Sequence, residues 1–246
     1  MKILVVGGTG LIGTNVANKL KKDGHEVIIG SPSCGIDIIT GDGLSEALRN
    51  TDIVIDLSNS SSPEEENAIN FFRTAGKNLV AAEQLAGIKH HVILSIVGID
   101  NVQHIGYLRA KKDQEDAIIN SGIDYTIIRS TQFHEHIYSI ITVQSKDNQV
   151  YVSTLDFQPI AADDVADYVV KFALESAKNT TIEIAGPEKA PMTDFVSRYI
   201  NAKCPDRTVI SDNENKYMFY EFPQSGLVPE GDYKQGKIYF DDWVKK

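Results

Sequence analysis

Cysteine is scarce in this sequence, which has only Cys34 and Cys204 among its 246 residues. Neither belongs to a Cys-x-x-Cys pair, so the sequence argues against a disulfide framework and against a cysteine-based zinc site. The apolar run at residues 2–7 is too short for a signal peptide, and no run is long enough to span a membrane. We therefore expect a cytoplasmic protein whose cysteines stay reduced.

Basic residues are also fewer than acidic residues. Lys and Arg together number 24 against 34 Asp and Glu, which gives a formal net charge of −10. A field of this sign repels phosphate backbones and acidic lipid, so we expect no nucleic-acid partner and no membrane partner. Apolar residues make up 42% and charged residues 24%, as in ordinary globular proteins. A small-molecule substrate is the expected partner, and the oligomeric state is left open.

Strand-like and helix-like segments alternate through the first half of the chain. Continuous apolar runs predict strands over residues 2–7, 26–30, 36–39, 53–57, 91–97 and 125–129. Apolar spacing and end signals predict helices over 11–23, 44–49, 63–86 and 103–121, with Pro63 in the first turn of the third. This alternation predicts an α/β fold, a Rossmann-type doubly wound parallel sheet with helices on both faces.

The second half of the chain is less regular. Residues 140–152 predict a strand pair or a strand with a loop, and residues 181–185 a further strand. Helices are predicted over 162–176, with Asp163 as N-cap, and over 193–202, beginning with a capping Thr. We predict a single domain over residues 1–246, in which residues from about 130 to 246 form a small C-terminal substrate-capping region.

Seven residues between the first strand and the first helix read Gly7-Gly8-Thr9-Gly10-Leu11-Ile12-Gly13. A glycine after the strand permits a tight turn, a central glycine lets the backbone approach a pyrophosphate, and the last allows close helix packing. We expect the N–H groups from Gly10 to Ile12 to face the phosphates at the helix N-terminus. In this strand–turn–helix context the motif predicts a nicotinamide dinucleotide site, with a glycine-rich turn that binds no ligand as the alternative.

The end of the second strand bears on the choice of cofactor. NAD enzymes usually carry an acidic residue there, but this chain reads Gly30-Ser31-Pro32-Ser33. Ser31 and Ser33 can donate hydrogen bonds to a 2′-phosphate, although no Arg stands beside them. The segment therefore favours NADP over NAD.

Tyr107 and Lys111 stand one helical turn apart on the helix that follows the strand containing Ser95. A nearby ammonium lowers the pKa of a tyrosine from about 10, which would let Tyr107 exchange a proton with a carbonyl or alcohol. Ser95 would hold the substrate oxygen. The same spacing recurs twice elsewhere, at Tyr199/Lys203 and Tyr233/Lys237. Only the first pair lies on a helix that follows the strand containing Ser95, and this position favours Tyr107 as the catalytic tyrosine. The alternative is that Tyr107 packs its ring and has no chemical role.

The glycine loop, Ser95 and the Tyr107-x-x-x-Lys111 pair resemble the short-chain dehydrogenase/reductase superfamily. The start GGTGLIG, the segment at 56–59 and the segment at 160–166 are most similar to its atypical, NmrA-like NAD(P)-binding branch. The resemblance covers about residues 1–190. The chain departs from the family pattern in two ways. It lacks the basic residue that NADP-binding members often carry near the glycine loop or the second strand, and it has a tyrosine, Tyr107, that many NmrA-like proteins lack.

That resemblance implies roles for further residues. Lys111 would also hold the nicotinamide ribose, and Leu57 and Ser58 would line the adenosine side. The segment at 129–133, with Gln132 and Phe133, would border the nicotinamide and the substrate.

We therefore predict an NAD(P)-dependent oxidoreductase that moves hydride between nicotinamide and a carbonyl or alcohol carbon. Ser95 would position the oxygen, Tyr107 would transfer the proton, and Lys111 would tune Tyr107. A second hypothesis is a non-catalytic NAD(P) sensor whose partner binding changes with cofactor state, and a third is an isomerase or epimerase with retained cofactor. The sequence does not identify the substrate.

Histidines offer two further candidates. The run His134-Glu135-His136 lacks a third ligand in the sequence, so we predict no metal and expect one of these two histidines or Phe133 to line a substrate pocket. The pair His90-His91 precedes a predicted strand and is expected to form a surface turn.

Overall fold

The computed structural model describes residues 1–60, 62, 65–212 and 214–246. The chain divides into two units, and the first consists of Met1–Ser95, Gln103–Arg129 and Ala166–Ile182. The second consists of Ile96–Val102, Ser130–Val165 and Glu183–Lys246. The chain thus leaves the first unit after Arg129 and returns to it at Ala166, whereas the division into a sheet and a capping region stays a prediction.

The first unit is built on parallel strands, namely β1 (Lys2–Val6), β2 (Glu26–Gly30), β3 (Ile53–Asp56), β4 (His90–Ile96) and β5 (Tyr125–Ser130). Together with β9 (Thr180–Ala185) and β14 (Tyr233–Gln235) they form a seven-stranded sheet in the order β14-β9-β5-β4-β3-β1-β2. Strand β1 pairs with β2 on one side and β3 on the other, so the winding direction reverses at β1. This arrangement confirms the predicted doubly wound α/β fold, and ligands of such sheets bind beyond the carboxyl ends at the reversal.

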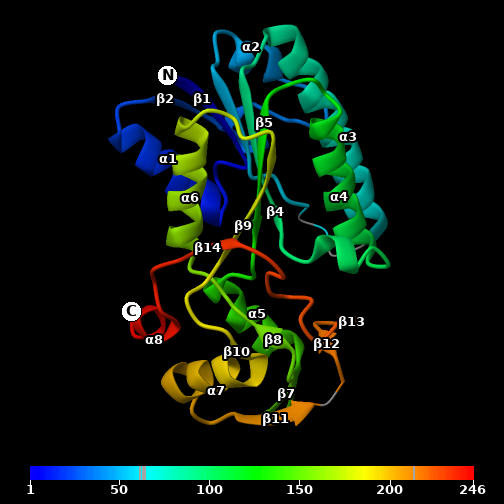
Figure 1. Ribbon diagram of the computed structural model, residues 1–246, viewed down its shortest axis with the longest axis vertical. Coiled ribbons are helices and arrows are strands. Elements are labelled where there is room, and N and C mark those ends of the chain that lie inside the picture. Colours follow the sequence, from blue (N-terminus) through cyan, green and yellow to red (C-terminus); the bar gives the residue numbers. More distant parts are fainter. Residues whose placement is uncertain (61, 63–64, 213) are drawn as a thin grey trace. The chain divides into compact units, whose positions relative to one another are not determined.

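Helices cover both faces of this sheet. Helices α1 (Leu11–Lys22) and α6 (Ala162–Leu174) lie on one side, and α3 (Glu65–Ala86) and α4 (Gly106–Ile119) lie side by side on the other (Figure 1). The short α2 (Leu44–Leu48) precedes β3. The predicted first-turn residue Pro63, and Glu64 with it, fall outside the described residues. Among the described helices, none combines the length and the apolar character needed to cross a bilayer.

Two sequence predictions of strands are wrong. Residues 36–39 lie in a loop and belong to no strand, and Ile36 and Ile38 are buried in the apolar cluster beside α2 and α3. Their apolar character reflects the anchoring of a loop to the core. The first part of the segment 140–152 belongs to helix α5 (Ile137–Val143), because its apolar residues recur at helical spacing, and the strand pair begins only at residue 145.

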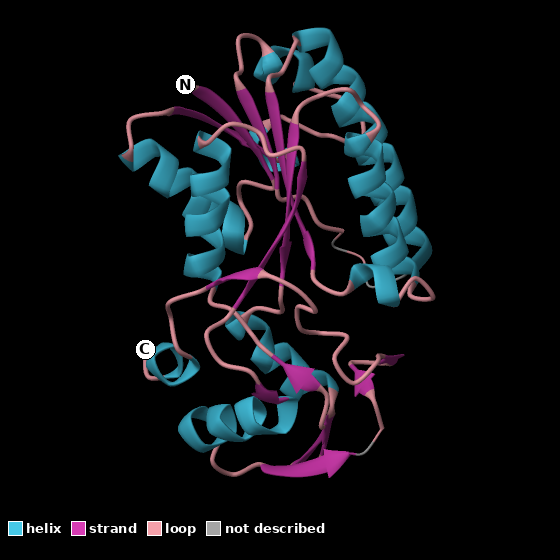
Figure 2. Ribbon diagram, viewed as in Figure 1, coloured by secondary structure: helices cyan, strands magenta, loops and turns pink. Residues whose placement is uncertain are grey.

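The second unit contains short elements (Figure 2). Strands β6 (Ser145–Lys146), β7 (Gln149–Ser153) and β11 (Thr208–Asp212) form one sheet, and β8 (Asp156–Phe157) pairs with β10 (Ala190–Pro191). A hairpin joins β12 (Lys216–Tyr217) to β13 (Tyr220–Glu221), and the unit also contains α5, α7 (Met192–Lys203) and α8 (Phe240–Val244). Phe157, Phe195 and Phe240 form an aromatic core here.

The predicted helix caps in the second half are misplaced. Helix α7 begins at Met192 with Pro191 in the capping position, so the threonine that follows lies inside the first turn. Helix α6 begins at Ala162, which puts Asp163 in its first turn. An acidic side chain there still complements the positive end of the helix.

Candidate functional site

The glycine loop leaves β1 and opens α1, and Gly7 and Gly13 have the least room for a side chain among its glycines. Gly7 has a φ of 72°, and a Cβ there would lie 2.5 Å from the carbonyl oxygen of Leu57. A Cβ on Gly13 would lie 2.1 Å from the carbonyl oxygen of Gly7. Three backbone segments thus meet without intervening side chains, so the loop presents its main chain to a ligand.

The start of α1 provides backbone N–H groups for an anion. The first intrahelical bond is donated by Thr14 N–H to the Gly10 carbonyl at 2.9 Å, which leaves the N–H groups of residues 11–13 without an acceptor within the helix. No acidic side chain lies in this first turn. The Gly10 N–H, expected to face a phosphate, instead donates to the Gly7 carbonyl at 3.0 Å. A pyrophosphate therefore fits residues 11–13, where the helix dipole favours negative charge.

The two strands that pair with β1 lead into segments that flank the loop. Ser31 follows β2 and is buried, and its Oγ lies 2.9 Å from the Oγ of Ser33. Leu57 follows β3 and packs its backbone against Gly7, while the next residue, Ser58, is buried. The structure thus brings the sequence-predicted adenosine-side residues to the glycine loop.

Tyr107 and Lys111 share a helix but not a hydrogen bond. The Lys111 ammonium donates to the Leu94 carbonyl at 2.9 Å and to Gln114 Oε1 at 2.7 Å. The Tyr107 hydroxyl donates to Asn59 Oδ1 at 2.9 Å. The two side chains are therefore engaged with different partners.

The pKa values follow from this arrangement. Burial raises the pKa of Tyr107 to about 12, although the hydrogen bond to Asn59 acts in the opposite direction. Burial lowers the pKa of Lys111, against the opposing effect of the carboxylates of Asp56 and Glu115. The expectation that Lys111 lowers the pKa of Tyr107 is wrong, because the ammonium is directed to other acceptors. The catalytic roles of Ser95, Tyr107 and Lys111 stay predictions.

A layer of buried polar groups lies beside Lys111, and the sequence analysis missed it. Gln114 Nε2 donates to Asp56 Oδ2 at 2.7 Å, and Asp56 Oδ1 accepts the Ser58 N–H at 2.9 Å. Asp56 ends an otherwise apolar strand, and Gln114 stands three residues after Lys111 on the same helix face. These two sequence features could have indicated the buried polar layer before the structure was known.

The next residue of α4 belongs to a second buried contact. Glu115 accepts two hydrogen bonds from Arg129 on β5, with Nε–Oε1 at 2.9 Å and Nη2–Oε2 at 2.6 Å. This bidentate pair ties α4 to the sheet. Ser95, on the neighbouring strand β4, is also buried, and its Oγ has no hydrogen-bond partner among the described residues.

The predicted surface turn at His90-His91 is wrong, because both residues lie in β4 and are buried. His91 Nδ1 lies 2.9 Å from both carboxylate oxygens of Glu83 on α3. Burial disfavours the imidazolium, but the Glu83 carboxylate outweighs it and raises the pKa of His91. His90 points to the opposite face and its Nε2 lies 2.9 Å from Thr126 Oγ1.

Comparison with known families bears on the ligand of this loop. A family model described as NAD(P)H-binding matches residues 7–176, which includes the glycine loop, Ser31, the polar layer and Lys111. The chain belongs to this NAD(P)H-binding family. The main-chain cradle at residues 7–13 fits the pyrophosphate of such a cofactor.

Relatives of this NAD(P)H-binding protein are named for different roles. It is 28% identical over 214 residues to a photosystem II assembly factor, Ycf39, of Synechocystis, a match that covers 80% of this chain. It is 26% identical over 228 residues to the chloroplastic divinyl chlorophyllide a 8-vinyl-reductase of Arabidopsis thaliana, which covers 77% of this chain. The chain spans only 66% and 54% of the lengths of these two relatives.

A solved structure supports the fold. The NAD(P)H-binding protein superposes on a dTDP-4-dehydrorhamnose reductase from Clostridium acetobutylicum with a TM-score of 0.74 at 18% identity, covering 98% of this chain and 91% of the other. This likeness confirms the fold, and the family match shows that the chain belongs to an NAD(P)H-binding family.

The predicted substrate-side residues lie in the second unit. Gln132 Oε1 accepts a hydrogen bond from the Tyr217 hydroxyl at 3.0 Å, and Phe133 lies with its ring centroid 5.0 Å from that of His136. His134 is buried, and burial lowers its pKa to about 4. The substrate-binding roles of Gln132 and Phe133 stay predictions.

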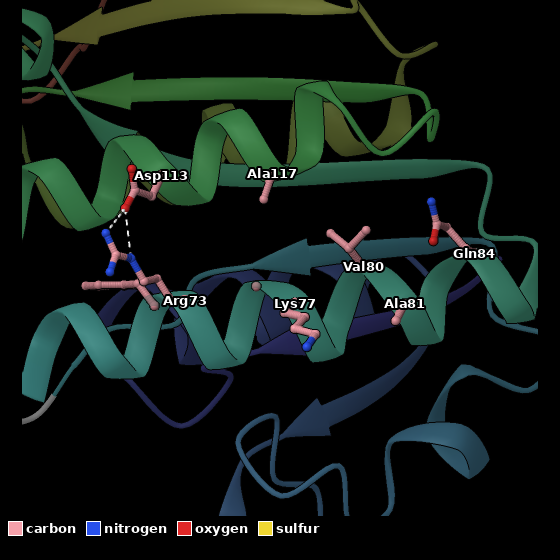
Figure 3. A pocket seen from close by; sticks show the side chains of 9 residues that line it. Arg73, Lys77, Val80, Ala81, Gln84, Asp113 and Ala117 are labelled. Carbon is pink, nitrogen blue, oxygen red and sulfur yellow. Dashed lines mark hydrogen bonds and ion pairs between the residues drawn. The ribbon is translucent and has the colours of Figure 1, made fainter.

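A groove of about 430 Å³ lies between α3 and α4, and side chains of both helices line it (Figure 3). Its lining includes none of the sequence-predicted site residues, and an ion pair between Arg73 and Asp113, with Nη2–Oδ2 at 3.1 Å, crosses it. We therefore do not assign the cofactor to this groove.

Proposed function

We propose that NAD(P)H is a regulatory ligand of this protein, and that its binding controls association with a protein partner. The observation that carries the proposal is the engagement of the Lys111 ammonium with Leu94 and Gln114, away from Tyr107. A proton relay of the Ser–Tyr–Lys type needs a tyrosine whose pKa approaches the working pH, whereas burial raises the pKa of Tyr107 to about 12.

Similarity to Ycf39 supports the same reading. That relative is named for the assembly of photosystem II, which is a task of protein association. In this chain, the loop at residues 7–13 would hold the pyrophosphate, Leu57 and Ser58 the adenosine side, and Lys111 the ribose. The nicotinamide supplies hydride chemistry when bound, but the proposal assigns no proton donor to that chemistry.

Turnover measurements test this proposal. We expect calorimetry to show that the purified protein binds NADPH. With each of a panel of carbonyls and quinones, we expect NADPH to be oxidised no faster in the presence of the protein than in its absence. We also expect Tyr107→Phe to leave the Kd for NADPH within about twofold, since the hydroxyl contacts Asn59 rather than Lys111. Turnover that Tyr107→Phe abolishes would contradict the proposal.

The second strand supports a preference for NADPH. No carboxylate lies in the turn at residues 31–36, and Ser31 and Ser33 place two hydroxyl groups together there. We expect NADPH to bind about tenfold more tightly than NADH, the equivalent of one or two good hydrogen bonds. Parallel calorimetric titrations measure the ratio, and equal or reversed affinities would contradict it.

An oxidoreductase is the second candidate, and the buried, unpartnered Ser95 Oγ favours it. Here hydride would pass between nicotinamide and a carbonyl or alcohol carbon, Ser95 would hold the oxygen, and Tyr107 would give or take the proton. Similarity to a vinyl-reductase also supports reductive chemistry. Loss of turnover in Ser95→Ala, on any substrate that the parent protein uses, would favour this candidate.

A further inference from the structure

An unbroken line of buried hydrogen bonds connects Lys111 to the turn after β3. Lys111 Nζ donates to Gln114 Oε1 at 2.7 Å, Gln114 Nε2 donates to Asp56 Oδ2 at 2.7 Å, and Ser58 N–H donates to Asp56 Oδ1 at 2.9 Å. All four residues are buried, with exposed fractions of 4%, 4%, 2% and 8% in the order Lys111, Gln114, Asp56, Ser58.

The direction of these bonds is fixed by chemistry. An ammonium can only donate and an ionised carboxylate can only accept. The Gln114 amide therefore turns its oxygen to Lys111 and its nitrogen to Asp56. A flipped amide would place its NH2 group against the Lys111 ammonium and its oxygen against the Asp56 carboxylate, and neither pair can form a hydrogen bond. Gln114 is thus the one residue in this line that needs both a donor and an acceptor.

The far end of the line reaches the glycine loop. Asp56 holds the N–H of Ser58, and the neighbouring Leu57 packs its carbonyl against Gly7, so the turn at 57–58 and the loop are fitted together. The near end is anchored where Lys111 donates to the Leu94 carbonyl of β4. Any shift of Gln114 would therefore disturb both the turn beside the loop and the ammonium.

We propose that Asp56 and Gln114 are positioning residues of the NAD(P)H site, which hold the 57–58 turn and the Lys111 ammonium in one fixed arrangement. The inference rests on the proposed cofactor site and deepens it. Neither residue need touch the cofactor. Their effect on affinity arises because the turn and the ammonium are already in place before the cofactor binds.

A polarity swap tests the proposal. Asp56→Asn leaves its amide nitrogen facing one of the two donors, either Gln114 Nε2 or the Ser58 N–H, and Gln114→Glu places a carboxylate against Asp56, so each single variant breaks the line. In the double variant D56N/Q114E, the new amide at position 56 donates to the new carboxylate at position 114. That carboxylate also accepts from Lys111, so the line is restored with the same total charge. We expect each single variant to weaken NADPH binding about tenfold and the double variant to return to within about threefold of the parent.

A pH profile separates positioning from general destabilisation. In Gln114→Glu the two facing carboxylates share a proton as the pH falls from about 8 to about 5, which restores a hydrogen bond between them. NADPH affinity of this variant, relative to the parent, should therefore recover over that range. Asp113→Asn is the matched control, because it removes a carboxylate from the same helix at the Arg73 ion pair and should change neither affinity nor its pH profile.

Several outcomes would overturn the inference while leaving the cofactor site intact. These are single variants that bind NADPH as the parent does, a double variant no better than the singles, or losses that only follow the melting temperature. If Asp56→Asn does not fold, Gln114→Met provides a second test, because it removes both hydrogen bonds of Gln114 without adding charge. We again expect NADPH affinity to fall about tenfold. A folded parent that binds neither NADPH nor NADH would instead refute the proposed function.

Discussion

Replacing Gly13 by alanine is expected to weaken NADPH binding by about a hundredfold or more. The added Cβ would lie 2.1 Å from the Gly7 carbonyl oxygen and 2.7 Å from the Gly8 Cα, and both are backbone atoms that cannot rotate away. Helix α1 or the loop must move, and overpacking of this kind typically costs about 1–3 kcal/mol. The displaced atoms are the ones that would hold the pyrophosphate, so the loss falls on affinity as well as stability.

Gly76→Ala provides the matched control for this experiment. Gly76 lies inside α3, where a Cβ would meet only the Gln114 Cγ at 4.0 Å, an ordinary contact. Alanine is favoured over glycine in a helix interior by up to about 1 kcal/mol, so this variant should be as stable as the parent or more so. Calorimetric titration with NADPH and thermal unfolding measure both variants. Tight NADPH binding by a folded Gly13→Ala variant would show that the loop is not the pyrophosphate site.

Replacing Glu83 by glutamine is expected to lower the free energy of unfolding by about 3–5 kcal/mol, because it removes one partner of a buried ion pair. The side chains of His91 and Glu83 are 3% and 0% exposed, so water cannot replace the lost carboxylate. Glu46→Gln on α2 is the control, since its partner Arg49 lies at the surface and such pairs contribute at most about 1 kcal/mol.

This effect should depend on pH in a defined direction. The folded protein holds the His91 proton more tightly than the unfolded chain, because the Glu83 carboxylate raises the pKa of His91 above its ordinary 6.5 despite burial. The stabilisation is complete below pH 6.5 and is lost as the pH rises through the folded-state pKa.

Other charged groups also act on this histidine. Asp56 on β3 raises the pKa of His91 and Lys111 on α4 lowers it, and both remain in the variant. Urea unfolding at about pH 6 and about pH 9 should therefore show a smaller difference between parent and Glu83→Gln at the higher pH. A difference that stays constant or grows with pH would contradict the assignment of His91 as the protonated partner.

Local sequence was enough for much of the cofactor half. Continuous apolar runs identified the buried parallel strands, and glycines beside a strand end and a helix start identified the loop, because each signal acts between residues a few positions apart. The same signals misplaced residues 36–39 and 140–143, which were predicted as strand. An apolar residue can be buried by packing a loop or a short helix as well as by a strand, and spacing over four residues does not separate these cases.

The sequence by itself determined the doubly wound fold and the loop at residues 7–13, since the close backbone approaches at Gly7 and Gly13 leave no room for a side chain. Only the tertiary structure decided which acceptors the Lys111 ammonium reaches and that His91 meets Glu83. The contacts of Lys111 with Leu94 and of His91 with Glu83 join residues from separate strands and helices, and a buried charge binds whichever opposite charge or dipole the fold places beside it. A spacing of four residues could place Tyr107 and Lys111 on one helix face, but the ammonium is engaged by the Leu94 carbonyl of β4 and by Gln114, whose amide in turn donates to the distant Asp56.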